Sequence, residues 1–389
     1  MTRPLFRRFS HWSALREIHR VHLHALVLPH AAYLSAHGVA LPADPGALDY
    51  ERLGLFLLDL PHDAPPLLVD GLYHVHEMAT REGAEALIDA AAAAGIALST
   101  VHSLAPADIA AQIWLADPEL LRGQHAQATI DRRKSFDSYL PRPGPRPPLA
   151  NLEASVPALE RAVDAWYAER QKGRGAKIFA SETEHEVRLI VRHGGLYKRE
   201  GSLENGEPSS VHYRPMAFSL AIYDRRSGEL LLNAKGKREK DMYRERVGYC
   251  LFGDRDFFLG STPKYTLEPL RRDGRECLRW SDVPGIRRVL LREVTMYLGG
   301  AYEHRRTESA AEVFLALEER GEFLPHDALP TAAKFEFTFA DSAKPRPVKI
   351  YHGNTAQYTR DGDADLVEQW FRQRQFILQG ARHAALAHA

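Results

Sequence analysis

The sequence predicts an α+β protein, in which a helical N-terminal domain precedes a mixed, mainly antiparallel β-rich domain that ends in a hairpin and a helix. Apolar residues recur at three- and four-residue spacing through the first third of the chain, whereas later segments are rich in branched and aromatic residues. The length of 389 residues also exceeds that of a usual single domain. We expect a helical domain over 1–140, a proline-rich linker over 141–150, a β-rich α+β domain over 151–300 and a C-terminal α+β subdomain over 301–389.

The first third is expected to be helical. Thr80 is suited to begin an alanine-rich helix, and Gly95 is suited to end it. Asp70 and Asp117 can cap two further segments. The apolar spacing predicts helices over 14–26, 53–58, 72–79, 84–94, 109–114 and from Pro118 toward Phe136.

Extended structure is expected after the linker. Segment 141–148 contains five prolines, which remove backbone donors and favour extended conformations. The turn-forming residues 224–228 separate two β-type runs and predict an antiparallel hairpin. Segments 265–270 and 277–280 continue a mixed pattern, and 288–297 fits a strand or a helix. We further expect strands over 185–191, 210–214, 218–223 and 229–232, a helix over 309–321, a hairpin of 335–339 with 348–351, and a helix over 363–376.

Composition narrows the function classes. Lys plus Arg and Asp plus Glu both total 51, so a polyanion would have to be bound by a local patch. No run approaches the roughly 18 apolar residues that span a bilayer. Cys250 and Cys277 are too few for a disulfide framework, which favours a reducing compartment. We expect a cytoplasmic protein with no membrane partner, from a GC-rich bacterial source in view of its many alanines and arginines.

Histidines are numerous, at 19, and two close pairs of them are candidate metal sites. His22 and His24, and likewise His74 and His76, are two residues apart and so point to different sides of a helix, whereas zinc-binding helices use positions i and i+4. A structural or surface role is therefore favoured. His76 with Glu77 is the metal candidate that remains.

Arg192 and His193 end a β-type run and are followed by two glycines. This string resembles the opening signature of the histidine phosphatase superfamily, and the resemblance implies that His193 takes the phosphoryl group while Arg192 neutralises phosphate charge. His352 follows another β-type run and is a second candidate. The simpler interpretation is a strand end turned by Gly194 and Gly195.

Asp224, Glu229 and Lys235 form a second catalytic candidate, because metal-dependent nucleases place two acids and a lysine on a β-hairpin to bind Mg²⁺ and orient water. In those enzymes the second acid and the lysine are two residues apart on one strand face. Glu229 and Lys235 are six apart, so a turn acid and surface charges are the simpler interpretation.

A basic stretch with interleaved tyrosines is the candidate nucleic-acid interface. Its cations can neutralise phosphates while an aromatic ring stacks on bases. A solvated helical face with ion pairs is the alternative. The candidate residues are Lys235, Lys237, Arg238, Lys240, Tyr243, Arg244 and Arg246.

These observations favour a non-catalytic accessory or regulatory protein that binds a DNA or RNA backbone or docks on a protein partner. The alternative is a phosphoester hydrolase that uses one of the two catalytic candidates. Because neither a P-loop nor a dinucleotide fingerprint occurs, we expect no ATP or NAD cofactor.

Overall fold

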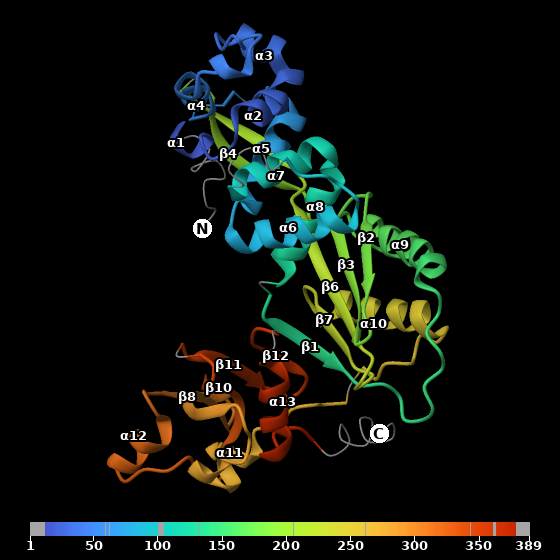
Figure 1. The fold of residues 1–389 in the computed structure, drawn as a ribbon. Coiled ribbons are helices and arrows are strands. Elements are labelled where there is room, and N and C mark those ends of the chain that lie inside the picture. Colours follow the sequence, from blue (N-terminus) through green and yellow to red (C-terminus); the bar gives the residue numbers. More distant parts are fainter. Residues whose placement is uncertain are drawn as a thin grey trace. The chain divides into compact units, whose positions relative to one another are not determined.

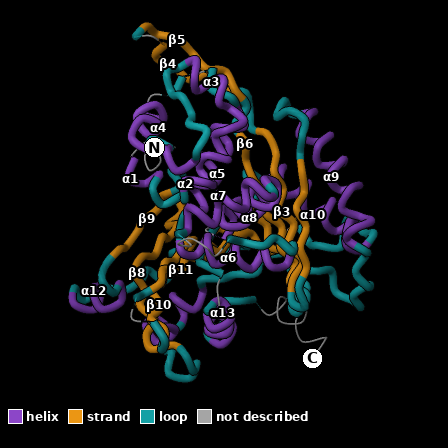
Figure 2. The backbone as a smooth tube through the Cα atoms, turned by 45° about the horizontal axis from the view of Figure 1, so that its top comes forward, coloured by secondary structure: helices purple, strands orange, loops and turns teal. Residues whose placement is uncertain are grey.

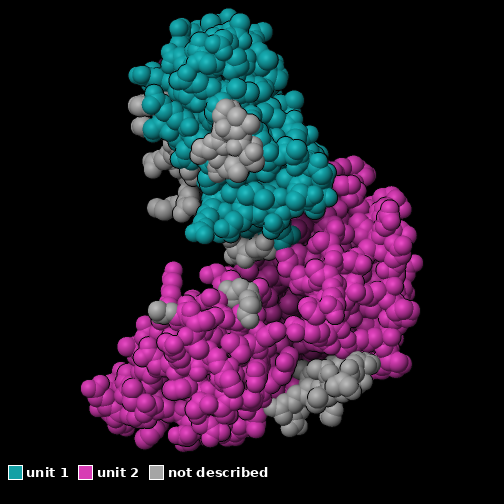
Figure 3. Space-filling model, in the orientation of Figure 1, with its two compact units in different colours: residues 1–129 teal, residues 130–389 magenta. Residues whose placement is uncertain are grey.

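The computed structural model describes residues 12–58, 60–61, 63–99, 105–131, 133–204, 206–260, 262–342, 344–360 and 363–378. The chain divides into two compact units, Met1–Thr129 and Ile130–Ala389 (Figure 3). The expected class, a helical N-terminal region followed by an antiparallel sheet and a C-terminal helix, is confirmed. Within the described residues, no helix is long and apolar enough to cross a membrane.

The first unit is built from helices around one apolar core (Figure 1). Thr80 begins α6 as predicted, because its side chain accepts a hydrogen bond from the Gly83 N–H, and Gly95 follows the helix with a φ of 69°. The helix α5 begins at Pro66, ahead of the predicted cap Asp70. Its helices are α1 (Trp12–Leu15), α2 (Arg20–Val27), α3 (Ala31–Ala36), α4 (Tyr50–Leu58), α5 (Pro66–Met78), α6 (Arg81–Ala93), α7 (Pro106–Ala116) and α8 (Pro118–Asp131).

The second unit is organised by a ten-stranded antiparallel sheet in the order β2-β3-β6-β7-β1-β12-β11-β10-β8-β9. Its strands are β1 (Ser135–Tyr139), β2 (Lys177–Glu182), β3 (Glu186–Gly194), β6 (Met216–Asp224), β7 (Leu230–Asn233), β8 (Ile286–Gly299), β9 (His304–Ser309), β10 (Leu329–Phe339), β11 (Arg346–Tyr351) and β12 (Thr355–Gln357). The expected hairpins β6–β7 and β10–β11 are confirmed, and 288–297 belongs to a strand.

The expected continuation of α8 toward Phe136 is wrong. The helix ends at Asp131, and Phe136 lies in β1. Pairing decides the conformation here, since β1 bonds to β7 on one side and to β12 on the other. Helical spacing in the local sequence is overridden by these distant partners.

A two-stranded ribbon extends β3 and β6 beyond the sheet (Figure 2). It consists of β4 (Lys198–Glu204) and β5 (Glu207–Tyr213). The turn from β3 into β4 begins at Gly194, paired with Met216 at the start of β6. The ribbon therefore projects from the end of the sheet at which β3 stops and β6 starts.

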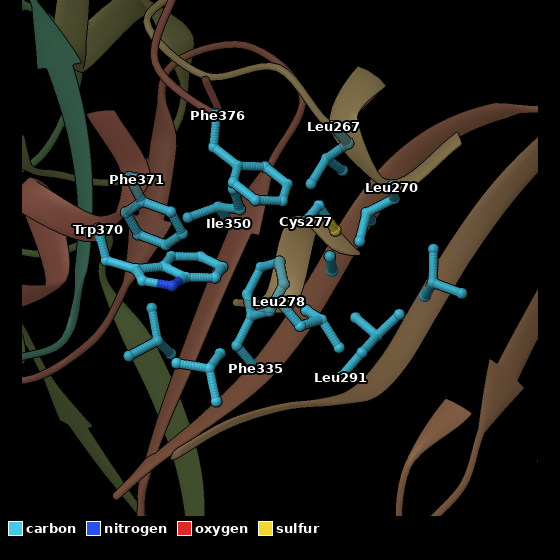
Figure 4. Packing of buried hydrophobic residues seen from close by; sticks show 14 of the residues in the cluster. Leu267, Leu270, Cys277, Leu278, Leu291, Phe335, Ile350, Trp370, Phe371 and Phe376 are labelled. Carbon is cyan, nitrogen blue, oxygen red and sulfur yellow. The ribbon is translucent and has the colours of Figure 1, made fainter. Parts of the chain in front are cut away.

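Two helices cover one face of β2, β3, β6 and β7: α9 (Leu152–Glu169) and α10 (Lys237–Phe252). The helices α11 (Glu268–Arg272), α12 (Val313–Glu319) and α13 (Ala364–Gln373) accompany the remaining strands. Trp370 and Phe371 of α13 pack against Phe335 of β10 and Ile350 of β11 (Figure 4). Aromatic residues thus fix α13 on the sheet.

The segment 141–150, expected to be a linker, lies within the second unit. The Arg142 N–H donates to the carbonyl of Phe257, and the Ala150 N–H donates to that of Leu251. The division between the two units falls instead at Thr129 and Ile130. Prolines keep the segment extended, but backbone hydrogen bonds at both of its ends attach it to the unit that follows.

Candidate nucleic-acid interface

The basic stretch lies at the start of α10, immediately after β7. Gly236 precedes the helix with a φ of 73°, and Lys235, Lys237 and Arg238 are exposed around it. None of these three cations has an ion-pair partner among the residues that the structure describes. Lys237 and Arg238 lie in the first helical turn, where the helix dipole disfavours positive charge.

The rest of the stretch is engaged in the fold. The ammonium of Lys240 lies 2.5 Å from an Asp137 carboxylate oxygen, and Arg244 donates to the carbonyl of Phe258 at 2.7 Å. Arg246 is half-buried. Tyr243 is 2% exposed and its hydroxyl lies 2.9 Å from that of Tyr167, so its ring cannot stack on a base. Helical periodicity turns Tyr243 toward the core, and charge density alone could not indicate this.

Further cations lie at the same end of the sheet. Lys172 binds Glu239 of the first turn of α10 at 2.7 Å, and the preceding residue, Gln171, offers its carbonyl to Arg214 at the root of the ribbon. Lys198 and Arg199 at the start of β4 are exposed, and neither has an ion-pair partner in the described chain. We call the set Lys198, Arg199, Arg214, Lys235, Lys237 and Arg238 the basic end of the sheet.

The ribbon also presents aromatic rings that sequence reasoning missed. Tyr197 is 60% exposed and Tyr213 is 36% exposed. The guanidinium of Arg214 lies 5.5 Å from the centre of the Tyr197 ring. The sequence contains a signal for them, since a tyrosine is next to Lys198 and another is next to Arg214. These two cations are far apart in the sequence and come together only when β4 pairs with β5.

A buried polar network lies beneath the basic end. The Ser219 hydroxyl is 3.1 Å from Nε2 of His193 and 3.0 Å from a Glu239 oxygen, and Tyr167 stacks on the His193 ring. Burial lowers the pKa of His193. Burial also opposes ionisation of Glu239, but the bond from Lys172 outweighs it and lowers the Glu239 pKa. The network therefore engages the imidazole and the carboxylate in contacts within the fold.

The histidine phosphatase candidates do not converge. Arg192 and His193 are consecutive in β3 and so face opposite sides of the sheet. His352 follows β11, and β6, β7, β1 and β12 lie between β3 and β11, a separation of about 24 Å at normal strand spacing. His193 is 5% exposed, with Nδ1 2.9 Å from the Gly194 carbonyl. Both of its ring nitrogens are thus occupied by contacts within the fold.

The nuclease candidates are divided between two ends of β7. Asp224 accepts hydrogen bonds from the Arg226 N–H and the Ser227 hydroxyl and stabilises the turn. Glu229 immediately precedes the strand and pairs with Lys264 at 2.6 Å, whereas Lys235 follows the other end. Asp224 and Glu229 both line a cleft, and the cation that meets Glu229 is Lys264.

The histidine–carboxylate candidate lies in the first unit. Nε2 of His76 is 4.0 Å from one Glu77 oxygen, and Nε2 of His125 is 3.9 Å from the other. No group of three or more histidine, cysteine or acidic side chains in the described residues is placed to hold a metal ion.

Comparison with known proteins finds no family model and no curated protein sequence that matches this chain.

Proposed function

We propose that the protein is a non-catalytic accessory protein that binds a single-stranded nucleic-acid backbone at the basic end of the sheet. The observation that carries this proposal is the group of exposed cations without acidic partners, gathered from α10 and the ribbon. Cations of this kind neutralise phosphates and release counterions. Basic and acidic residues are equal in number over the whole chain, so the attraction for a polyanion has to come from this local patch.

The position of two of these cations supports a role outside folding. Lys237 and Arg238 occupy the first turn of α10, where positive charge costs about 0.3–1 kcal/mol. A residue that stabilised the helix would be acidic there. A negatively charged binding partner would account for cations at this unfavourable position.

The tyrosines of the ribbon favour a single strand over a duplex. Tyr197 and Tyr213 are exposed beside Lys198, Arg199 and Arg214. Unpaired bases can stack on such rings while the cations follow the backbone, and stacking depends little on sequence. We therefore propose weak base preference and a steep dependence on salt.

The proposed compartment is the cytoplasm. Cys250 and Cys277 are both buried and unpaired, which supports a protein that works under reducing conditions.

The test is fluorescence anisotropy with labelled single-stranded and double-stranded DNA and RNA over a range of salt concentrations. Replacing Lys235, Lys237 and Arg238 together with alanine should weaken single-strand binding and reduce the salt slope by about 2, since each contact contributes roughly 0.7. Tyr197→Ser should weaken binding without changing the slope.

The matched control replaces Arg287, Arg288 and Arg305 with alanine. These exposed cations lie on β8 and β9, at the far side of the sheet, and the change in net charge is the same. The control variant should bind like the wild type. Absence of binding to every nucleic acid at low salt, or an equal loss in both triple variants, would contradict the proposal and favour docking on a protein.

A further inference from the structure

A cleft lies on the face of β3, β6 and β7 opposite to α9 and α10. Strand alternation places Ile222 and Leu231 on this face, while their neighbours Ala221 and Leu230 enter the core beneath the two helices. The other wall is the polar side of α13. The cavity measures about 1060 Å³, enough for a small organic ligand. We call it the α13 cleft, and it is independent of the basic end.

A network of ion pairs forms its base. Lys264 is fully buried, and its ammonium lies 2.6 Å from a Glu229 oxygen and 3.1 Å from a Glu368 oxygen. Ser138 donates to Glu229 at 2.8 Å, and Arg372 donates to Glu368 at 2.7 Å. Each carboxylate thus already accepts at least two charged or polar donors.

Arg360 also lines the cleft, but unlike Lys264 and Arg372 it makes no hydrogen bond to a carboxylate in the described chain. Its guanidinium carbon lies 5.2 Å from the centre of the Phe136 ring and 4.5 Å from that of Tyr358. Its nearest carboxylate oxygen, on Glu368, is 3.7 Å away. The buried Nε–H has no hydrogen-bond partner within the described part of the chain. Two aromatic rings therefore hold a guanidinium whose Nε–H the fold leaves without a hydrogen bond.

The remaining cations of the cleft are already paired. Arg226 bonds both oxygens of Asp365, and Arg188 bonds Glu186 at 2.7 Å. Around the cleft, if Lys264 is counted and His185 is not, the number of cations equals the number of carboxylates. The cations are Arg188, Arg226, Lys264, Arg360 and Arg372, and the carboxylates are Glu186, Asp224, Glu229, Asp365 and Glu368. A ligand with several negative charges would meet as many carboxylates as cations. Arg360 is the lining cation that the described chain holds through an ion pair at 3.7 Å and not through a hydrogen bond, so a single negative charge can still hydrogen-bond to it.

We propose that the α13 cleft binds a small organic monocarboxylate through the guanidinium of Arg360. The planar fork of an arginine matches the two oxygens of a carboxylate. The stacked rings fix the orientation of that fork before the ligand arrives, which lowers the entropic cost of binding. Ile222 and Leu231 supply the apolar surface for the body of the ligand.

The test observes the arginine Nε–H signals by NMR in the full-length protein labelled with ¹⁵N-arginine. Three probes of similar size are titrated: benzoate, phenyl phosphate and benzamide. Benzoate should shift the Arg360 signal with a dissociation constant of about 1 mM, as expected for a single charge-assisted anchor. Phenyl phosphate, a dianion at neutral pH, should bind more weakly, and benzamide should leave the signal unchanged.

The Arg360 signal is assigned as the one lost in Arg360→Lys. Because Glu368 keeps its bonds from Lys264 and Arg372, this variant should fold. In the Arg360→Lys variant, benzoate binding is measured from the signals of the other arginines of the cleft. Its affinity should fall roughly tenfold. Arg272→Gln removes an exposed arginine bonded to Asp273 outside the cleft and should bind benzoate normally. An unchanged Arg360 signal with all three probes, tighter binding of phenyl phosphate, or full binding by Arg360→Lys would each overturn the proposal.

Discussion

The basic end of the sheet and the ion network beneath the α13 cleft both collect charged side chains, under opposite conditions. At the basic end Lys235, Lys237 and Arg238 are exposed, and the described chain gives them no acidic partner. In the network Lys264 is fully buried between two carboxylates. Removing a charge should therefore affect binding in the first region and folding in the second.

Lys264→Met should have the largest effect on stability. The substitution leaves Glu229 and Glu368 without the cation that they share, and loss of one member of a buried ion pair costs about 3–5 kcal/mol. The measurement is urea unfolding followed by circular dichroism. The double variant Lys264→Met with Glu229→Gln should recover part of the loss. If Lys264→Met alone is as stable as the wild type, the buried network does not support folding, and the contrast with the basic end is wrong.

Acid should weaken the same network. Burial opposes ionisation of Glu368, but Lys264 and Arg360 outweigh it and lower its pKa from 4.5 to about 2. Because the folded pKa is depressed, the stabilisation is present above pH 4.5 and is lost as the pH falls toward 2. It amounts to about 3 kcal/mol. Unfolding measured across this range should show a smaller slope in Glu368→Gln, and an identical slope would contradict the assignment.

Tyr243→Phe tests the boundary between the basic stretch and the core. It should reduce the free energy of unfolding by about 1–2 kcal/mol, because the buried Tyr167 hydroxyl loses its partner. The double variant with Tyr167→Phe should regain most of that energy. Nucleic-acid affinity should stay unchanged in both variants, and a selective loss of affinity would return Tyr243 to the interface.

Replacing Lys237 and Arg238 with alanine should have the smallest effect on folding, and of opposite sign. Both cations lie where the dipole of α10 disfavours them, so their removal should raise stability by about 0.5 kcal/mol. The thermal midpoint of the purified protein is the measurement. A clear loss of stability would show that these cations support the fold.

Sequence reasoning succeeded where the signal is local. Thr80 begins α6, and residues 224–228 join β6 to β7, because capping and turn chemistry act within a few residues. The exposed cations of α10 were found for the same reason, since they are neighbours in the chain.

The remaining features depend on distant pairing. Lys264 is 35 residues from Glu229 and 104 from Glu368, so no scan of neighbouring residues associates them. The guanidinium of Arg360 packs on the ring of Phe136. Phe136 lies in β1, where the sequence predicts a helix. Tyr243 was misplaced because the charges around it obscured its position on the apolar side of α10.

The central position of β1 has a consequence for synthesis on the ribosome. Its residue Ser135 pairs with Gln357, 222 residues later, and β12 is its only neighbour on that side. At roughly 5–20 residues per second, about 10–45 s pass between translation of the two. Throughout that interval one side of β1 has no strand of its own chain to bond with. A nascent chain therefore exposes a temporary strand edge, which a chaperone or a second unfinished copy can occupy.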